Sequence, residues 1–207
     1  MTLPRFYPIL DTGVCERKKL PLDSAARAIL EAGVRILQIR HKGHFSRDLF
    51  AACESIAAMC DEAGALFVIN DRADIAALLN AGLHLGQEDL PAVEARRIAP
   101  AAVIGFSTHN EGQLHAAADL PADYLAIGPI FGTASKENPD PVVGLGELKR
   151  LRPLTSKPLV AIGGITRANA DQVFTAGADS VAIIGDLYDG VGNAPDLRNR
   201  CEEFLRL

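Results

Sequence analysis

The sequence predicts a single-domain α/β protein in which eight parallel strands and the helices between them close into a (β/α)₈ (TIM) barrel. Short apolar runs recur eight times along the 207 residues, and helix-like stretches separate them. Several runs are apolar at successive positions, which is typical of strands buried on both faces of a parallel sheet. No low-complexity linker interrupts the series, so we expect one domain over residues 1–207. A doubly wound open sheet is the alternative, but it needs fewer strands.

The expected strands are the apolar runs themselves. Residues 66–69 read Leu-Phe-Val-Ile, and residues 181–184 read Val-Ala-Ile-Ile. The eight runs are residues 6–11, 36–41, 66–70, 83–86, 103–108, 124–131, 158–163 and 180–185. Barrels of this kind carry their functional groups at the carboxyl ends of the strands, so the polar residues that follow each run are the site candidates.

The expected helices lie between the strands and have recognisable ends. In residues 46–63 the apolar side chains recur at helical spacing, and Ser46 can cap the first turn. Three more helices are expected at residues 23–32, 166–176 and 196–205. Ala-Gly pairs close three of these four segments, and glycine there can adopt the left-handed conformation that ends a helix.

The composition excludes several classes of protein. The charges are mixed, with 21 basic and 26 acidic residues and a net charge of −5. This balance argues against a nucleic-acid or anionic-membrane binder, so an anionic ligand needs local positive charge. No apolar run approaches the roughly 18–20 residues of a membrane span, and the N-terminus lacks a signal-peptide pattern. The four cysteines form no Cys-x-x-Cys pair and no metal-ligand spacing, so we expect a soluble, reduced, cytoplasmic protein.

A row of polar side chains ends the second expected strand. Alternation sends Gln38, Arg40 and Lys42 to one face of this strand and Ile39 and His41 to the other. An inward row of this kind is costly unless it meets an anion, and phosphate oxygens match Arg and Lys well. A solvated strand end is the alternative of equal weight, because Arg and Lys are rarely buried unless paired.

Carboxylates follow the third and fourth expected strands. Asn70 and Asp71 end the third, and Asp89 follows the fourth. Each alone is more typical of a helix cap. Two carboxylates after adjacent parallel strands can nevertheless converge on one Mg²⁺, which takes oxygen ligands and keeps its other positions for water and phosphate. Beside Arg40 and Lys42, this pattern indicates a site for a diphosphate with Mg²⁺.

Hydroxyl groups and a further cation follow the fifth and sixth expected strands. Ser107 can donate to an anion or accept from a ring amine, or else act as a helix cap. No helix pattern resumes between the sixth strand and about residue 144, and a loop this long is typical of a functional lid. Within it, Thr133, Ser135 and Lys136 supply two hydroxyls and a cation suited to phosphate. A disordered surface loop is the alternative.

Glycines end the seventh and eighth expected strands, at Gly163, Gly164 and Gly185. Glycine there lets backbone N–H groups approach a phosphate, as in many phosphate-binding barrels. The chain thus has two candidate anion sites, which suits a transferase from which diphosphate leaves while cations and Mg²⁺ stabilise its charge. No strong general base is evident, so the attacking atom should need no deprotonation.

Together these motifs resemble those of thiamine phosphate synthases over nearly the full length. The matching stretches are residues 38–42, 70–72, 86–89, 107–109, 128–131, 133–136 and 162–165. Each is weak alone, but their order and spacing are specific. The resemblance implies a (β/α)₈ barrel that joins 4-amino-5-hydroxymethyl-2-methylpyrimidine diphosphate to 4-methyl-5-(2-phosphoethyl)thiazole. Diphosphate would leave first, and the neutral thiazole nitrogen would attack the resulting pyrimidine-methyl cation to give thiamine phosphate.

The resemblance also implies roles for individual residues. The pyrimidine diphosphate would be bound by Gln38, Arg40, Lys42, Asn70, Ser107 and Lys136. Mg²⁺ would be held by Asp71 and Asp89. The thiazole phosphate would be bound by Thr133, Ser135, Gly164, Ile184 and Gly185. The expected catalytic residues are Arg40, Lys42, Ser107 and Lys136.

Three positions depart from the family's pattern. Ser135 stands where threonine is common, Gly132 where proline is common, and Gly185 where serine is frequent. The last change removes one hydroxyl contact to the thiazole phosphate. The alternatives are a thiazole tautomerase of the same fold, with His109 as acid and base, and a non-catalytic ligand-sensing barrel. The expected partners are small-molecule substrates, with no nucleic acid and no membrane, and a homodimer is left open.

Overall fold

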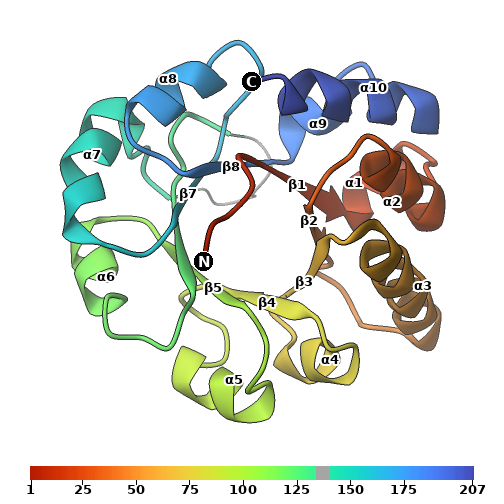
Figure 1. Cartoon of the computed structure of the whole chain (residues 1–207), viewed down its shortest axis with the longest axis horizontal. Coiled ribbons are helices and arrows are strands. Elements are labelled where there is room, and N and C mark those ends of the chain that lie inside the picture. The colour runs from red at the N-terminus through yellow and green to blue at the C-terminus, as the bar shows by residue number, and fades with distance from the viewer. Residues whose placement is uncertain (134–139) are drawn as a thin grey trace.

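The computed structural model describes residues 1–133 and 140–207, in which eight parallel strands close into one barrel (Figure 1). The strands are β1 (Phe6–Asp11), β2 (Ile36–Arg40), β3 (Leu66–Asn70), β4 (Gly82–Leu85), β5 (Ile104–Thr108), β6 (Tyr124–Ile127), β7 (Leu159–Ile162) and β8 (Ser180–Ile183). Each strand pairs with the next in sequence, and β8 pairs with β1 to complete the ring. The predicted closed barrel is confirmed, and the open sheet is excluded.

Helices surround the barrel on the outside (Figure 1). They are α1 (Thr12–Arg17), α2 (Leu22–Glu31), α3 (Arg47–Ala63), α4 (Ala73–Leu78), α5 (Ala92–Ile98), α6 (Glu111–Ala116), α7 (Gly144–Leu151), α8 (Ala170–Thr175), α9 (Gly185–Tyr188) and α10 (Ala194–Leu205), with a 3₁₀ turn at Arg152–Leu154. Ser46 caps α3 as predicted, because its hydroxyl accepts a hydrogen bond from the Leu49 N–H at 3.2 Å. Gly64 ends the same helix in the left-handed region, at φ 62°. Among the described helices, none is both long and apolar enough to cross a bilayer.

Strand β6 is shorter than the apolar run that predicted it. It ends at Ile127, whereas the run continues to Phe131. Pro129 has no N–H to donate to a strand ladder. Beyond it, the N–H groups of Ile130 and Phe131 donate to backbone carbonyls of residues 162 and 163 at the end of β7, at 2.9 and 3.0 Å. The chain therefore leaves the barrel wall and crosses toward β7 at the carboxyl end.

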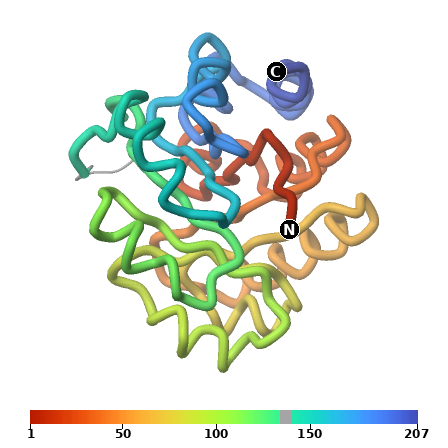
Figure 2. The backbone as a smooth tube through the Cα atoms, turned by 60° about the vertical axis from the view of Figure 1, so that its left-hand side comes forward, coloured from red at the N-terminus to blue at the C-terminus, as the bar shows by residue number. Residues whose placement is uncertain are grey.

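The two ends of the chain meet on one side of the barrel. Helix α10 lies beside α2 in both backbone views (Figures 1 and 2). The Phe6 and Phe204 rings stack with centroids 4.7 Å apart. The Arg198 and Glu31 side chains form an ion pair at 3.6 Å, which joins α10 to α2. These contacts cover β1 and hold the first and last units of the barrel together.

Two apolar cores lie on either side of the ring of strands. The outer core, between strands and helices, contains the buried thiols Cys53 and Cys60 of α3. The inner core fills the barrel and consists of Leu3, Tyr7, Ile9, Ile36, Val68, Tyr124, Ala126, Val160 and Ala182. Leu3 precedes β1 and is 6% exposed, and the N-terminus lies over the middle of the ring in Figure 1. Side chains thus fill the amino end of the barrel, and the space for a ligand is at the other end.

Candidate active site

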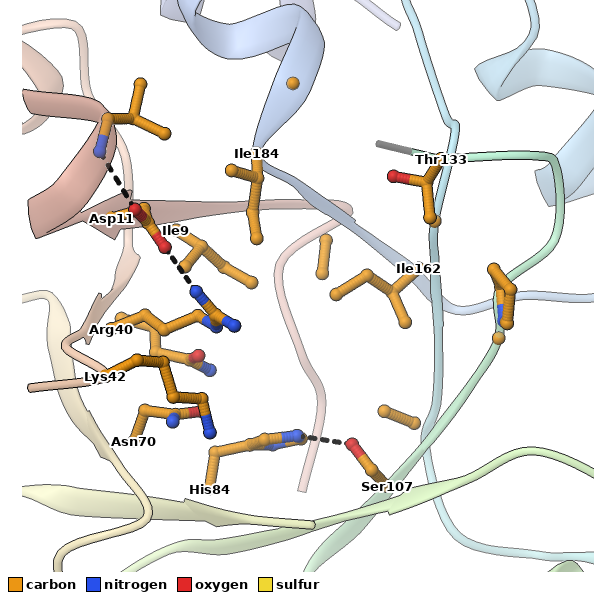
Figure 3. Close-up of a pocket in the computed structure, with 18 of the residues that line it drawn as sticks. Ile9, Asp11, Arg40, Lys42, Asn70, His84, Ser107, Thr133, Ile162 and Ile184 are labelled. Carbon is orange, nitrogen blue, oxygen red and sulfur yellow. Dashed lines mark hydrogen bonds and ion pairs between the residues drawn. The ribbon is translucent and has the colours of Figure 1, made fainter. Parts of the chain in front are cut away.

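A cavity of about 1800 Å³ lies at the carboxyl ends of the strands. In Figure 3, Arg40, Lys42, Asn70 and His84 lie on one side of it, and Thr133, Ile162 and Ile184 lie on the other. The sequence-predicted site residues that line it are Gln38, Arg40, Lys42, Asn70, Asp71, Asp89, Ser107, Thr133, Gly164, Ile184 and Gly185. Ser135 and Lys136 lie outside the described residues. One cavity therefore gathers every predicted site residue that the structure describes.

Each of the two described cations predicted to bind diphosphate is paired with a carboxylate. Arg40 Nη1 lies 2.5 Å from Asp11 Oδ2, and the two side chains are 21% and 10% exposed. Lys42 Nζ lies 2.5 Å from Asp71 Oδ2, but the Lys42 side chain is 54% exposed. The predicted inward row is confirmed for Gln38, Arg40 and Lys42, which line the cavity. The prediction for His41 was wrong, because β2 has already ended and His41 turns to the cavity rim, where its Nδ1 bonds Thr12 Oγ1 at 2.8 Å.

The two predicted metal ligands lie close enough for the charge of one to act on the other. Burial and the neighbouring Asp89 carboxylate raise the pKa of Asp71 above its usual range, and Lys42 opposes that rise. Asp89 is held by the Gly86 N–H, which donates to its Oδ2 at 2.6 Å. Neither carboxylate caps a helix, because the N-cap residues of α4 and α5 are Arg72 and Pro91. The helix-cap interpretation is thus excluded for both.

This pair of carboxylates fits a divalent cation. Two carboxylates forced together repel each other, and a cation between them removes that repulsion. In the described part of the chain, no three His, Cys, Asp or Glu side chains converge into one cluster. The protein thus offers Asp71 and Asp89 as oxygen ligands and leaves further positions to water and substrate, the manner in which Mg²⁺ is usually bound.

A chain of neutral polar groups crosses the floor of the cavity. Gln38 Nε2 donates to the Tyr7 hydroxyl at 2.9 Å, and this hydroxyl bonds the Tyr124 hydroxyl at 2.9 Å. The His84 ring bonds the Tyr124 hydroxyl at 3.0 Å through Nδ1. Through Nε2 it bonds the Ser107 hydroxyl at 2.9 Å (Figure 3). Ser107 is thereby fixed from below, with its hydroxyl at the cavity surface.

Burial sets the charge state of this floor. It raises the pKa of Tyr7 to about 12, so the phenol stays protonated. It lowers the pKa of His84 to about 4, so the imidazole is neutral at pH 7. A neutral imidazole has one donor nitrogen and one acceptor nitrogen. His84 can therefore donate a hydrogen bond to one of the hydroxyls of Tyr124 and Ser107 and accept one from the other. The floor therefore brings no net charge to the cavity.

Asn70 presents an unused donor to the cavity. Its side-chain Nδ2 is buried and has no hydrogen-bond partner among the described residues. An unpaired buried amide is costly, and such groups are rare away from functional sites. The residue lies in register beside His84 on β4. An unpaired amide in the cavity lining therefore makes Asn70 a candidate ligand-binding residue.

The opposite wall of the cavity is built from backbone. Gly163 and Gly164 follow β7 at φ 95° and 64°, in the region that favours glycine. A Cβ on Gly163 would lie 2.5 Å from Pro129 Cβ, and one on Gly164 would lie 2.5 Å from the Gly132 carbonyl oxygen. Side chains at these two positions are thus excluded by space as well as by conformation. The loop after β7 packs directly on the loop after β6.

An ion-pair network joins this wall to β8. The Arg167 backbone N–H and Nε both donate to Asp186 Oδ2, at 3.0 and 2.9 Å. Arg200 Nη1 donates to the Asp186 carbonyl, and its Nη1 also lies 3.9 Å from Asp186 Oδ1. Burial opposes ionisation of Asp186, but the hydrogen bonds from Arg167 outweigh it and lower the Asp186 pKa. The loops that follow β7 and β8 are therefore tied to each other.

Sequence reasoning missed four residues of this site: Tyr7, Asp11, His84 and Tyr124. Each lies on a predicted strand and lines the cavity or its floor. The signal for His84 was a polar residue at an alternate position between Leu83 and Leu85. For Asp11 the signal was an acidic residue at the end of a strand beside one that ends in Arg40. The tyrosines carry no such signal, because their apolar rings suit any core.

Comparisons with known proteins agree with this geometry. The family model described as thiamine monophosphate synthase matches residues 6–187. The thiamine-phosphate synthase of Koribacter versatilis (strain Ellin345) is 46% identical, and the alignment covers 100% of this chain and 97% of that protein. The thiamine-phosphate synthase of Methanoculleus marisnigri is 44% identical, over 84% of this chain and 85% of that protein.

A solved structure agrees as well. The thiamine phosphate pyrophosphorylase from Pyrococcus furiosus superposes with a TM-score of 0.84 at 34% identity, over 98% of this chain and 93% of that one. The family model covers most of the chain, and the relatives match it almost from end to end. This chain belongs to the thiamine monophosphate synthase family.

Proposed function

We propose that this chain is a thiamine-phosphate synthase and carries out the reaction of its family. It joins 4-amino-5-hydroxymethyl-2-methylpyrimidine diphosphate to 4-methyl-5-(2-phosphoethyl)thiazole, releasing diphosphate and forming thiamine phosphate. The high coverage of the synthase relatives supports this assignment. The protein acts in the cytoplasm, with Mg²⁺, on small molecules.

One observation carries the proposal. Arg40, Lys42, Asp71 and Asp89 meet in the same cavity as the glycine wall of Gly164. Arg40 and Lys42, together with a divalent cation held by Asp71 and Asp89, can neutralise a diphosphate, and the wall offers close backbone approach to a second phosphate. A cavity equipped for two phosphorylated ligands fits a reaction between a diphosphate and a phosphate ester.

The chemistry needs charge stabilisation and no base. The bond between the pyrimidine methylene carbon and the diphosphate oxygen breaks, and a bond from that carbon to the thiazole nitrogen forms. Arg40 and Lys42 donate to the departing oxygens, and Lys136 is assigned the same task. Asp71 and Asp89 would hold Mg²⁺, which when bound would supply further positive charge to the diphosphate. No proton is transferred in forming the new bond, so the reaction does not need His84, which its pKa of about 4 makes a weak base.

The cavity floor suits the pyrimidine ring. Gln38 and Asn70 offer amide groups to the ring nitrogens and its amine, and Asn70 Nδ2 has no competing partner in the described residues. Ser107, held by His84, offers an acceptor to the same amine. The amine stabilises the pyrimidine-methyl cation by donating its lone pair into the ring.

The opposite wall is assigned to the thiazole phosphate. Thr133, Gly164, Ile184 and Gly185 line the cavity there, and Ser135 belongs to the same proposed set. Gly185 has no hydroxyl to offer, so its contact with the phosphate is made by backbone alone. The loops that carry Gly164 and Gly185 are tied by Arg167 and Asp186, which supports a preformed phosphate site on that part of the wall.

A direct assay tests the proposal. Purified protein is mixed with both substrates and Mg²⁺, and released diphosphate and thiamine phosphate are measured. We expect equal amounts of both products, no diphosphate release when the thiazole phosphate is omitted, and loss of activity with EDTA that added Mg²⁺ restores. Metal-independent isomerisation of a thiazole carboxylate phosphate, or binding of either substrate without turnover, would overturn it. Light scattering decides whether the chain forms a homodimer.

A further inference from the structure

Arg40 is supported by a carboxylate that is separate from the paired metal ligands. Asp11 ends β1 and Arg40 ends β2, and the two residues are partners in the strand register. Their side chains meet at 2.5 Å at the cavity wall (Figure 3). Only 10% of the Asp11 side chain is exposed, so water competes little for its oxygens. The contact is therefore built into the barrel.

The two oxygens of Asp11 have separate partners. Oδ1 accepts from the Val14 N–H at 3.0 Å and caps α1, while Oδ2 accepts from Arg40 Nη1. The Asp11 backbone N–H also donates to the Tyr188 hydroxyl at 3.3 Å. A carboxylate held at both oxygens cannot rotate without giving up one bond. Its position thus fixes the position of the guanidinium.

Arg40 keeps donors to spare in this arrangement. A guanidinium has five N–H donors, and the structure engages Nη1 with Asp11. No other described residue bonds the remaining N–H groups, so they can donate to an anion in the cavity. An arginine held in this way loses little further freedom when an anion binds, because its side chain is already ordered.

Lys42 differs from Arg40 because its carboxylate partner, Asp71, has other contacts to make. Asp71 bonds Lys42 but also faces Asp89 and is a proposed ligand of Mg²⁺. Arg40 therefore has a dedicated carboxylate, whereas Lys42 shares one.

We propose that Asp11 is a positioning residue that holds Arg40 in the orientation that receives the diphosphate of the substrate. This inference rests on the proposed function. Asp11 touches neither substrate and acts through Arg40. Its removal is expected to weaken use of the pyrimidine diphosphate and to leave the thiazole phosphate unaffected.

The test separates this role from helix capping. Asp11→Asn removes the charge but keeps a good capping oxygen, whereas Asp11→Ala removes both. We expect kcat/KM for the pyrimidine diphosphate to fall about 10- to 100-fold in both variants, since a misplaced binding group costs about this much. KM for the thiazole phosphate should not change, and Tm should fall further in Asp11→Ala, which loses the cap as well as the ion pair, than in Asp11→Asn. Wild-type kinetics in Asp11→Asn would show that Asp11 is only a cap and overturn the proposal.

A double-mutant cycle tests whether Asp11 acts through Arg40. In an Arg40→Ala background, Asp11→Asn should cause no further loss of kcat/KM, because the guanidinium that it positions is gone. Losses that multiply would assign Asp11 an independent role and refute the inference. Calorimetry with inorganic diphosphate and Mg²⁺ gives a readout without turnover, and Asp11→Asn should weaken this binding by a similar factor. If the wild-type protein neither binds diphosphate nor forms product, the proposed function itself is refuted. If the wild type is active and Asp11→Asn has the same kinetics and diphosphate affinity, only this inference is refuted.

Discussion

The two sides of the cavity present positive groups to anions in different ways. On the β1–β4 side, charged side chains do so, and each described cation there has a carboxylate partner, as Arg40 has Asp11 and Lys42 has Asp71. On the β7–β8 side, backbone does so, and space excludes side chains at Gly163 and Gly164. A charge can be removed with little change in shape, whereas a glycine cannot be replaced without moving its neighbours. Substitutions on the first side should therefore lower activity, and substitutions on the second should disturb the local structure.

The largest effect is expected on the charged side, from Asp71→Asn. It should lower turnover about 10²- to 10³-fold, since the loss of one preorganised charge interaction costs this much. Stability should change little, because Asp71 has φ 66° and Asn tolerates this left-handed conformation. Steady-state kinetics at high Mg²⁺ and a thermal melt measure the two outcomes.

A matched control lies three residues away. Asp74 is an exposed carboxylate that bonds Arg72 Nε and Nη2 at 2.8 and 2.6 Å. Asp74→Asn should leave turnover unchanged. Normal turnover in Asp71→Asn would remove that residue from the proposed metal site.

A smaller effect, on structure first, is expected on the glycine side from Gly164→Ala. The new methyl group would sit in the left-handed region and 2.5 Å from the Gly132 carbonyl. We expect the free energy of unfolding to fall by about 1–3 kcal/mol, and KM for the thiazole phosphate to rise more than KM for the pyrimidine diphosphate. Urea unfolding and kinetics with each substrate varied in turn provide the measurement.

Gly146→Ala is the control for that substitution. Gly146 lies in α7, where a Cβ would meet no atom within 4 Å. Alanine there should raise the free energy of unfolding by about 0.5–1 kcal/mol, because it restricts the unfolded chain and favours helix. If Gly164→Ala behaves like Gly146→Ala, the contrast between the two sides of the cavity does not hold.

The smallest effect concerns the ion pair that ties the β7 and β8 loops. The Asp186 pKa is lowered in the folded protein, so its charged form stabilises the fold above the unfolded value of 3.8. That stabilisation is lost as the pH falls through the lowered pKa. Asp186→Asn should cost about 1 kcal/mol at pH 7, and the gap to wild type should close in the acid range. Urea titrations from pH 7 down to the acid limit of folding test this, and a gap that stays constant would contradict it.

The repeating pattern of the sequence is strong enough to predict the barrel and the charged side of its cavity. Strand alternation sends Gln38 and Arg40 inward, and the carboxylates of Asp71 and Asp89 follow adjacent strands that must end side by side. Both arguments use short segments and one rule about where parallel strands end. The predicted end of β6 failed because the apolar run continues through Pro129 after strand pairing has stopped.

The floor of the cavity was beyond such reasoning. The hydroxyls of Tyr7 and Tyr124 bond each other across 117 positions of sequence, and His84 reaches Tyr124 across 40. No local pattern marks a tyrosine that will find a polar partner on the far side of a barrel. The ion pair between Asp11 and Arg40 is partly predictable. The strand register that makes the two residues neighbours follows from the barrel, but the bond from the Val14 N–H to Asp11 depends on the turn into α1.

The N-terminal segment helps to close one end of the barrel, because Leu3 packs into its inner core. Because Leu3 and the inner tyrosines fill the amino end, substrates and products must enter and leave at the carboxyl ends of the strands. A pyrimidine bound on the tyrosine floor, as proposed, would therefore enter before the thiazole phosphate, because both would use that opening. The packed inner core, with Leu3 at its amino end, thus confines ligand exchange to one end of the barrel.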